Sequence, residues 1–196
     1  MSEKTILYYN PTGKNITVKK YYKLVEKKNK KAIAEFIYNR LYSRYIKPFE
    51  FKDVDYKKEY KNGFSIMANA CLLIETLQSF KEGLGDSNRQ SEQLFKNFFM
   101  SNENFTKFKI TNSFNFYKKV RCGILHQGET TDGWRINRKK KTPLLQDKNI
   151  NVNKFMKELE KSLRAYRISL KQEEWDSEIW DNFRTKMRKI IKNTEG

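Results

Sequence analysis

One stretch, "GFSIMANACLLIETLQSF" at residues 63–80, limits the fold of this chain more than any other. Its apolar side chains recur every three or four positions, which is the period of an α-helix and not that of a strand. They form two neighbouring stripes, one of Phe64, Met67, Ala68, Cys71, Ile74 and Gln78 and the other of Leu73 and Leu77. A helix that is apolar around much of its circumference has to be surrounded by other elements. We therefore expect residues 63–80 to form the central helix of a bundle.

Further helical patterns flank this stretch on both sides. Apolar residues recur at helical spacing over 30–45, before Pro48, and again in four later stretches. The later stretches contain, in order, Leu94 to Phe99, Phe114 to Ile124, Val152 to Leu163 and Trp175 to Ile190. A length of 196 residues suits one domain with a real core. The sequence thus predicts a mainly α fold, with a single domain over 1–196 and a helical bundle over 30–196.

Two segments outside these patterns favour β structure. Within residues 1–29, β-prone runs at 6–9 and 16–18 flank Asn10-Pro11-Thr12-Gly13, where proline and glycine favour a turn. A small N-terminal β-hairpin appendage is therefore expected. Residues 130–150, "TTDGWRINRKKKTPLLQDKNI", alternate poorly and contain glycine and proline, so we expect a basic loop or hairpin there.

The charge of the chain indicates a polyanionic partner. It has 41 lysines and arginines against 23 aspartates and glutamates, a formal net charge of +18 at pH 7. Such an excess attracts nucleic acid or an anionic membrane surface. No run approaches the roughly 18 apolar residues of a membrane span, and the start "MSEKTILYYN" lacks the apolar core of a signal peptide. Charge alone does not choose between these two partners. We expect a cytoplasmic protein that binds RNA and no membrane, because Arg121 and His126 suit chemistry on phosphates.

The sequence predicts neither a metal nor a cofactor. It contains two cysteines, Cys71 and Cys122, and one histidine, His126. These are too few ligands, at no recognisable spacing, for a tetrahedral zinc site.

His126 lies five positions after Arg121, in "VRCGILHQGET". A neutral imidazole accepts a proton near physiological pH, and an imidazolium donates one. The arginine guanidinium is a permanent planar cation whose paired donors match phosphate oxygens. RNA cleavage without a metal needs a base for the 2′-hydroxyl, an acid for the leaving 5′-oxygen and positive charge on the non-bridging oxygens. Arg121 and His126 are therefore the candidate catalytic residues.

One imidazole cannot conveniently act as both base and acid. A two-fold homodimer would bring Arg121 and His126 of both subunits into one cleft and so supply the second imidazole. In a straight helix, five residues leave these two side chains about 140° apart. We therefore expect the helix to end or bend near Leu125, as Gly123 and Gly128 permit, unless the long arginine side chain reaches round.

The segment "FYKKVRCGILHQGET", with "ANACLLIETLQSF" before it, resembles the HEPN superfamily of bacterial conflict systems. Arg121 and His126 match the R-x4-6-H motif of that superfamily in its x4 form, at the end of a long helix. The resemblance implies a four- or five-helix bundle, a homodimer with the motifs paired at its interface, and metal-independent endoribonuclease activity. It also implies a toxin–antitoxin, abortive-infection or CRISPR-associated setting, in which an antitoxin or another defence-system subunit is a further partner.

Two positions depart from the pattern of the family. The residue after the arginine, often asparagine in the family, is Cys122. The position two after the histidine, often tyrosine in HEPN toxins controlled by a nucleotidyltransferase, is Gly128, so control by modification of that tyrosine is not supported. Some HEPN domains are catalytically silent. A non-catalytic nucleic-acid-binding, regulatory or assembly module therefore remains an alternative, with Arg121 and His126 as ordinary helix-end residues.

Four residues are expected to support the catalytic pair: Glu75, Tyr117, Cys122 and Gln127. Glu75 interrupts the apolar pattern of residues 63–80, and a carboxylate inside a core needs a cation. Arg121 is the first candidate for that cation, the alternative being that Glu75 lies on an exposed side of its helix. Cys122 and His126 are four residues apart and also permit a Cys–His nucleophile, although no third orienting residue is visible.

Basic and aromatic side chains beside the motif are the expected RNA contacts. Lysines and arginines hold phosphates without reading sequence, and aromatic rings stack on the bases of a single strand. The candidates are Lys118, Lys119, Trp134, Arg135, Arg138, Lys139, Lys140 and Lys141. The stretch "KKYYKLVEKKNKK", residues 19–31, is a second candidate track for the RNA backbone, or merely a solvated face.

Overall fold

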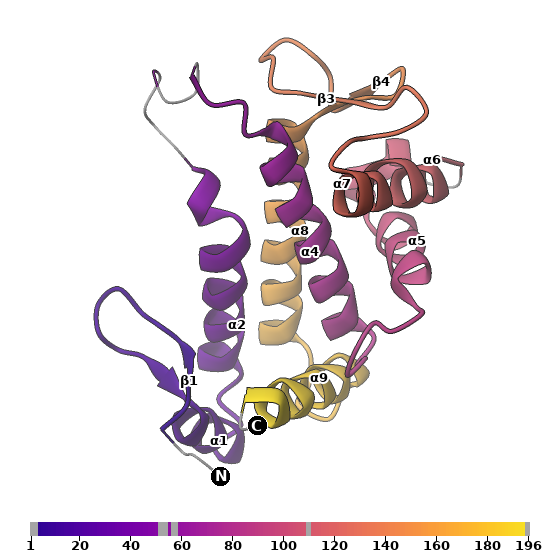
Figure 1. The fold of residues 1–196 in the computed structure, drawn as a ribbon. Coiled ribbons are helices and arrows are strands. Elements are labelled where there is room, and N and C mark those ends of the chain that lie inside the picture. The colour runs from indigo at the N-terminus through magenta and orange to yellow at the C-terminus, as the bar shows by residue number, and fades with distance from the viewer. Residues whose placement is uncertain (1–3, 51–54, 56–58, 109–110, 195–196) are drawn as a thin grey trace.

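The computed structural model describes residues 4–50, 55, 59–108 and 111–194, and most of them are helical. Three helices run side by side, α2 (Lys30–Tyr45), α4 (Gly63–Lys81) and α8 (Val152–Gln172), and α9 (Glu178–Thr194) packs against α4 at the lower end of the view in Figure 1. The expected mainly α fold is confirmed. None of the helices described is both long and apolar enough to cross a membrane.

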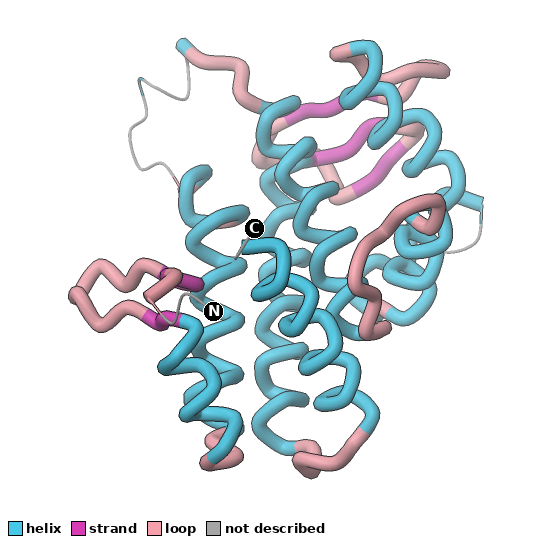
Figure 2. Tube along the Cα trace, turned by 60° about the horizontal axis from the view of Figure 1, so that its bottom comes forward, coloured by secondary structure: helices cyan, strands magenta, loops and turns pink. Residues whose placement is uncertain are grey.

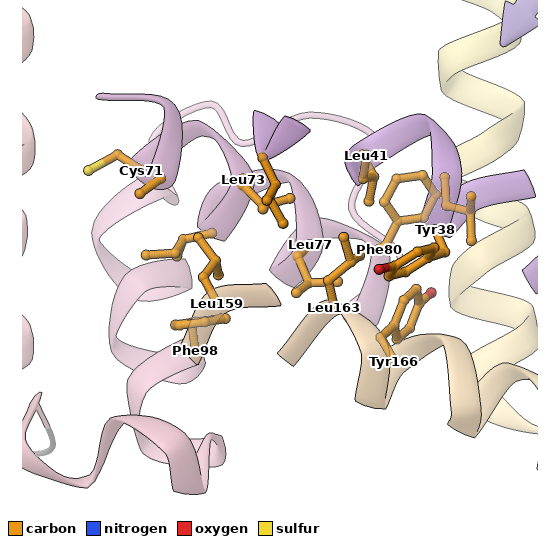
Figure 3. Packing of buried hydrophobic residues seen from close by; sticks show 14 of the residues in the cluster. Tyr38, Leu41, Cys71, Leu73, Leu77, Phe80, Phe98, Leu159, Leu163 and Tyr166 are labelled. Carbon is orange, nitrogen blue, oxygen red and sulfur yellow. The ribbon is translucent and has the colours of Figure 1, made fainter. Parts of the chain in front are cut away.

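The central helix expected over residues 63–80 is α4. It contacts α2, α8 and α9, and also two of the helices that follow it in the chain. Its buried residues are Ile66, Met67, Ala70, Cys71, Leu73, Ile74, Leu77, Gln78, Ser79 and Phe80. Figure 3 shows Leu77 of α4 and Leu163 of α8 in the same cluster, and the rings of Phe80 and Tyr166 approach with centroids 6.5 Å apart. Because apolar residues occupy most sides of α4, other elements cover it on most sides.

Side-chain caps set the beginnings of two long helices. The Asn29 side chain accepts a hydrogen bond from the Ala32 N–H at 3.1 Å, and the Asn151 side chain accepts one from the Lys154 N–H at the same distance. Each bond satisfies an N–H that has no partner inside the helix. The other end of α2 leads into a 3-10 turn, η1 (Lys47–Phe49), where a proline stops the helix as expected.

A cluster of phenylalanines connects the chain after α4 to α8. The chain continues through α5 (Ser91–Ser101) and a 3-10 segment, η2 (Glu103–Phe108). The cluster comprises Phe95, Phe98, Phe99, Phe105, Phe108, Phe116 and Phe155, all fully buried. The rings of Phe116 and Phe155 stack with centroids 5.4 Å apart. Since burying one such ring is worth about 1.5–3 kcal/mol, the cluster anchors the segment before Arg121 to α8.

The amino-terminal residues form the expected hairpin and also a helix that the sequence did not suggest. β1 (Ile6–Tyr8) pairs with β2 (Ile16–Thr17) in antiparallel fashion, and α1 (Val18–Glu26) follows directly. The many lysines of α1 made its narrow apolar face hard to recognise in the sequence. On that face, Val18 and Tyr21 are buried in the same cluster as the residues of the bundle. The stretch interpreted as a charged track is therefore partly a core element.

Residues 135–151 contribute a three-stranded sheet, seen near the top of Figure 2. Its strand order is β3 (Arg135–Asn137), β5 (Asn149–Asn151) and β4 (Leu145–Gln146). β4 and β5 form an antiparallel hairpin of the kind expected here, with Asp147 and Lys148 at positive φ in its turn. β3 pairs with β5 in parallel, which local sequence did not indicate because a lysine-rich loop separates the two strands.

Replacing Phe116 with alanine should lower the free energy of unfolding by about 3–5 kcal/mol, because a fully buried ring is lost and a cavity remains. Urea denaturation measures this change. Phe114→Ala is the matched control, since Phe114 lies two positions away and is 52% exposed, so its loss should stay within about 0.5 kcal/mol. Equal losses for the two variants would contradict the packing of the phenylalanine cluster.

Candidate functional site

The candidate catalytic pair lies on one irregular helical segment. α6 (Thr111–Asn115) leads into η3 (Phe116–Arg121), a wider π-helical turn, and α7 (Cys122–Gln127) follows. At the end of η3, a backbone N–H donates to the carbonyl five residues back instead of four. Single π-turns inside helices are rare and frequently mark functional sites. Arg121 is the last residue of this one.

The buried face of this segment agrees with the expected one at Val120 and differs from it at Phe114. Phe116, Val120 and Gly123 are buried, whereas Phe114, expected on the buried face, is 52% exposed. Phe114 and Phe116 lie on different faces of this helical segment, so the spacing of apolar residues alone did not decide which face is buried. The phenylalanine cluster decides between them, because Phe116 fills a place among its rings.

The helix ends two residues beyond Leu125, close to the expected place, and Gly128 is at its end as expected. α7 continues through Gln127 and ends at Gly128, whose φ of +70° favours glycine. Gly123 has a different role: a Cβ there would lie 2.5 Å from the carbonyl oxygen of Glu129. Its missing side chain lets the loop after α7 fold back onto the helix.

Glu75 of α4 holds the guanidinium of Arg121. The Nη2 atom of Arg121 lies 3.3 Å from Oε2 of Glu75, and the Ser91 hydroxyl of α5 donates to the other carboxylate oxygen at 2.8 Å. The two charged side chains are only 17% and 15% exposed. The ion pair expected between Glu75 and Arg121 is therefore present. Ser91 was not expected, because no sequence pattern connects it to Glu75.

Two further side chains contact the guanidinium. It lies 5.4 Å from the centre of the Tyr117 ring and 4.0 Å from the sulfur of Cys122. Burial opposes the charge on Arg121, but the nearby Glu75 carboxylate, with Tyr117, more than offsets this and raises the pKa of the guanidinium. Burial also raises the pKa of the Tyr117 phenol, and Cys122 adds to that rise. The site thus holds a permanent cation beside a neutral phenol.

His126 is exposed in the last turn of α7, as are its neighbours Leu125 and Gln127. No hydrogen bond or ion pair joins the His126 side chain to any other residue that the structure describes. The imidazole is therefore accessible, whereas Arg121 is held in place. An anchored cation and an accessible proton-transfer group on one helix suit chemistry on a phosphodiester.

Two of the expected RNA contacts lie beside Arg121 in the chain. Lys118 is exposed and forms an ion pair with Glu92 of α5 at 3.0 Å. Lys119 accepts a hydrogen bond through its backbone carbonyl from the Thr131 N–H at 2.9 Å, which holds the loop after α7 against the π-turn. Both lysines belong to the same helical segment as the motif.

The other basic candidates lie beyond the motif, towards the amino end of α4. Arg138 donates from Nη1 to the Asn62 side chain at 2.6 Å, just before α4 begins, and Arg135 is exposed on β3. The exposed loop residues that follow are Lys139, Lys140 and Lys141. At about 1.5 Å per residue, the chain from Asn62 to Glu75 rises about 20 Å along α4. The basic candidates therefore form two groups, and Arg138 belongs to the group remote from Glu75.

Trp134 does not have the surface position that stacking on RNA requires. Its side chain is 4% exposed and packs within the hydrophobic core. The stacking role expected for Trp134 is therefore wrong. Its neighbours in the sequence are polar and basic, which suggested a surface segment, but the chain turns this ring inward just before β3.

Comparison of the chain with protein-family models, with curated proteins and with solved structures found no match. The chemistry of the site is therefore argued from its own residues. Within residues 4–50, 55, 59–108 and 111–194, no group of three or more His, Cys, Asp or Glu side chains is placed to hold a metal ion.

The pair of Glu75 and Arg121 should show a coupling free energy of about 1–2 kcal/mol, because both charges are largely removed from water. A double-mutant cycle with Glu75→Gln and Arg121→Gln, followed by urea denaturation, measures it. The pair of Asp132 and Lys148, whose side chains are 52% and 51% exposed, is the matched control and should couple by less than about 0.5 kcal/mol. Coupling no larger than in the control would contradict the anchoring of the motif helix by Glu75.

Proposed function

We propose that this protein is a metal-independent endoribonuclease that cleaves single-stranded RNA, of the HEPN type that its R-x4-6-H motif resembles. The observation that carries the proposal is an anchored, largely buried cation, Arg121, on the same helix as an exposed imidazole, His126. The cation suits charge that develops on a phosphate, and the imidazole suits proton transfer. The net charge of +18 favours RNA as the partner.

The proposed reaction is a transesterification at phosphorus. The imidazole of His126 takes the proton of the 2′-hydroxyl while that oxygen bonds to phosphorus and the bond to the 5′-oxygen breaks. A second imidazole, in its protonated form, gives a proton to the leaving 5′-oxygen. The guanidinium of Arg121 donates hydrogen bonds to the non-bridging oxygens, where negative charge increases. The products are a 2′,3′-cyclic phosphate and a 5′-hydroxyl.

A second copy of the chain supplies the second imidazole in a two-fold homodimer. Two exposed leucines support an interface at this place: Leu72 on α4 is 46% exposed, and Leu125 on α7 is 45% exposed. They lie on the two helices that the pair of Glu75 and Arg121 joins, and Leu125 is the neighbour of His126. An interface that buries both leucines would also bring the two motifs together.

The basic side chains have different tasks in this proposal. Lys118 and Lys119 hold phosphates close to the cleaved bond, and Arg135 with the loop lysines holds the strand farther away. The substrate is RNA in the cytoplasm. An antitoxin or another defence-system subunit restrains the activity, since an accessible imidazole leaves the site open to any single strand.

A non-catalytic RNA-binding, regulatory or assembly module is the second candidate. It is favoured by the exposed lysines of residues 139–141 and by the lack of any partner that would orient His126 among the residues described. Both candidates bind RNA through the same cations, so binding does not separate them. Cleavage does.

The wild-type protein should cleave an unstructured RNA in EDTA and leave cyclic-phosphate ends. His126→Ala and Arg121→Ala should each reduce the cleavage rate by at least about 100-fold, because each removes a group that acts in the transition state. Gel analysis of end-labelled RNA gives the rate, with RNA binding measured in parallel. Arg164→Ala, which removes an exposed arginine of α8, should keep the wild-type rate.

Three outcomes would contradict the catalytic proposal. They are equal cleavage by wild type and His126→Ala, binding without cleavage by the wild type, and a cleavage activity that EDTA abolishes.

Leu125→Asp should convert the dimer to a monomer, because it places a charge in the proposed interface. Analytical ultracentrifugation measures the change. Ile168→Asp is the matched control: Ile168 is 47% exposed on α8, outside the motif helix, and this variant should stay dimeric. A wild-type protein that remains monomeric at high concentration would refute the composite site.

A further inference from the structure

A cleft of about 640 Å³ lies between η1, the amino end of α4 and the first turns of α8. Its described lining residues fall within 46–50, 62–66 and 138–160, and no described residue of the motif helix contributes to it. Clefts that bind small ligands usually measure about 300–1,000 Å³ and combine an apolar surface with a few convergent polar groups. This cleft has both features.

The apolar part of the lining is formed by four side chains from four elements. Ile46 and Phe49 come from the end of α2 and from η1, Ile66 from α4 and Met156 from α8. Ile46, Ile66 and Met156 are buried, and Phe49 packs against the core cluster. A flat aromatic ring of a ligand would find an apolar surface here, including one aromatic partner.

Four cations line the cleft near the amino end of α8: Arg138, Lys140, Lys154 and Lys157. The ammonium groups of the three lysines form no ion pair with an acidic side chain among the residues described. The first turn of α8, which contains Lys154, adds the partial positive charge of a helix amino end. This end of the cleft therefore attracts an anion, and a phosphate group matches several converging cations.

Two carboxylates line the same cleft, and one oxygen of each already accepts a hydrogen bond. Glu50 accepts a hydrogen bond from the Tyr42 hydroxyl at 2.7 Å, and Glu160 accepts one from Nε of Arg164 at 2.9 Å. Each bond uses Oε1, and the other oxygen of each carboxylate makes no hydrogen bond to a described residue. Carboxylate oxygens in this state accept hydrogen bonds from sugar hydroxyls. Glu160 follows Lys154 by about 9 Å along α8, so the acidic group lies beyond the cationic end.

The cleft lies on the other side of α4 from the motif. Ile66 lines the cleft and Glu75 holds Arg121, and residues nine positions apart in an α-helix point about 180° apart. They are also about 13 Å apart along the helix axis. A ligand in the cleft would therefore contact α4 from the side opposite to Arg121.

We propose that this cleft is a second ligand site that takes a nucleotide unit. The phosphate lies among Lys140, Lys154 and Lys157, the ribose hydroxyls donate to Glu50 and Glu160, and the base lies on the apolar surface. The unit belongs either to a free 5′-nucleotide or to an unpaired nucleotide of an RNA strand. The proposal does not depend on ribonuclease activity, since the cleft contains neither Arg121 nor His126.

The test is equilibrium binding to the full chain, measured by isothermal titration calorimetry. The probes are the four ribonucleoside 5′-monophosphates, inorganic phosphate and a short oligouridine. The oligouridine alone is titrated into proteins that also carry His126→Ala, so that it is not cleaved, and His126 does not line the cleft. Two double variants are compared with the wild type. Lys140→Ala/Lys157→Ala removes two cations of the cleft, and Lys14→Ala/Lys192→Ala removes two exposed cations, one of the loop between β1 and β2 and one of α9. Because both variants lose the same charge, any difference between them reports on the cleft.

At least one monophosphate should bind saturably to the wild type and at least tenfold more tightly than inorganic phosphate. The cleft variant should weaken that binding by roughly tenfold, and the control variant by less than about twofold. If only the oligouridine binds, and the cleft variant alone weakens it, the nucleotide unit is supplied by RNA. The proposal fails if no probe binds, if both double variants weaken binding equally, or if inorganic phosphate binds as tightly as the monophosphates.

Discussion

Glu75 is the only carboxylate of α4, a helix whose other residues are largely apolar, and its pairing with Arg121 organises this side of the molecule. α4 has to be covered because its apolar residues face most directions, and α2, α8, α9 and α5 cover most of it. A carboxylate in such surroundings is costly unless a cation meets it. The segment that contains Arg121 therefore packs beside α4, where the Glu75 carboxylate contacts both the Arg121 guanidinium and the Ser91 hydroxyl of α5.

That requirement produces a difference between the two residues of the motif. The Arg121 guanidinium is fixed by Glu75 on one side and bordered by Tyr117 and Cys122 on the other, so it is an oriented cation. His126 lies five residues further along the same helical segment and is exposed. An RNA strand that binds from solvent would need both properties: a guanidinium held in one position and an imidazole that the strand can reach. The proposed function rests on this difference.

The cations of the chain differ in what they already bind. Several hold the fold together, as Arg167 does in its ion pair with Glu35 of α2. Others, such as Lys140 and Lys157, line a cleft without an acidic partner among the residues described. An unpaired cation in a concave site keeps its whole electrostatic attraction for a ligand, whereas a paired one shares that attraction with its carboxylate partner. The net charge of +18 therefore says less about ligands than the pairing of individual side chains does.

Local patterns in the sequence determined much of this protein. Periodicity indicated α2, α4 and α8, turn residues indicated the hairpin of β1 and β2, and one carboxylate in an apolar helix indicated the pair of Glu75 and Arg121. These features depend on residues close in the chain, or on a single charge with one evident partner.

Only the tertiary structure decided which of two similar faces is buried. It placed Phe116 inside and Phe114 outside, turned Trp134 into the core, and separated Arg138 from Arg121 along α4. It also assembled the cleft from residues within 46–50, 62–66 and 138–160, which are remote in sequence. The physical reason is that burial depends on which side chains meet in space, and the chain brings those partners together only when the whole core packs.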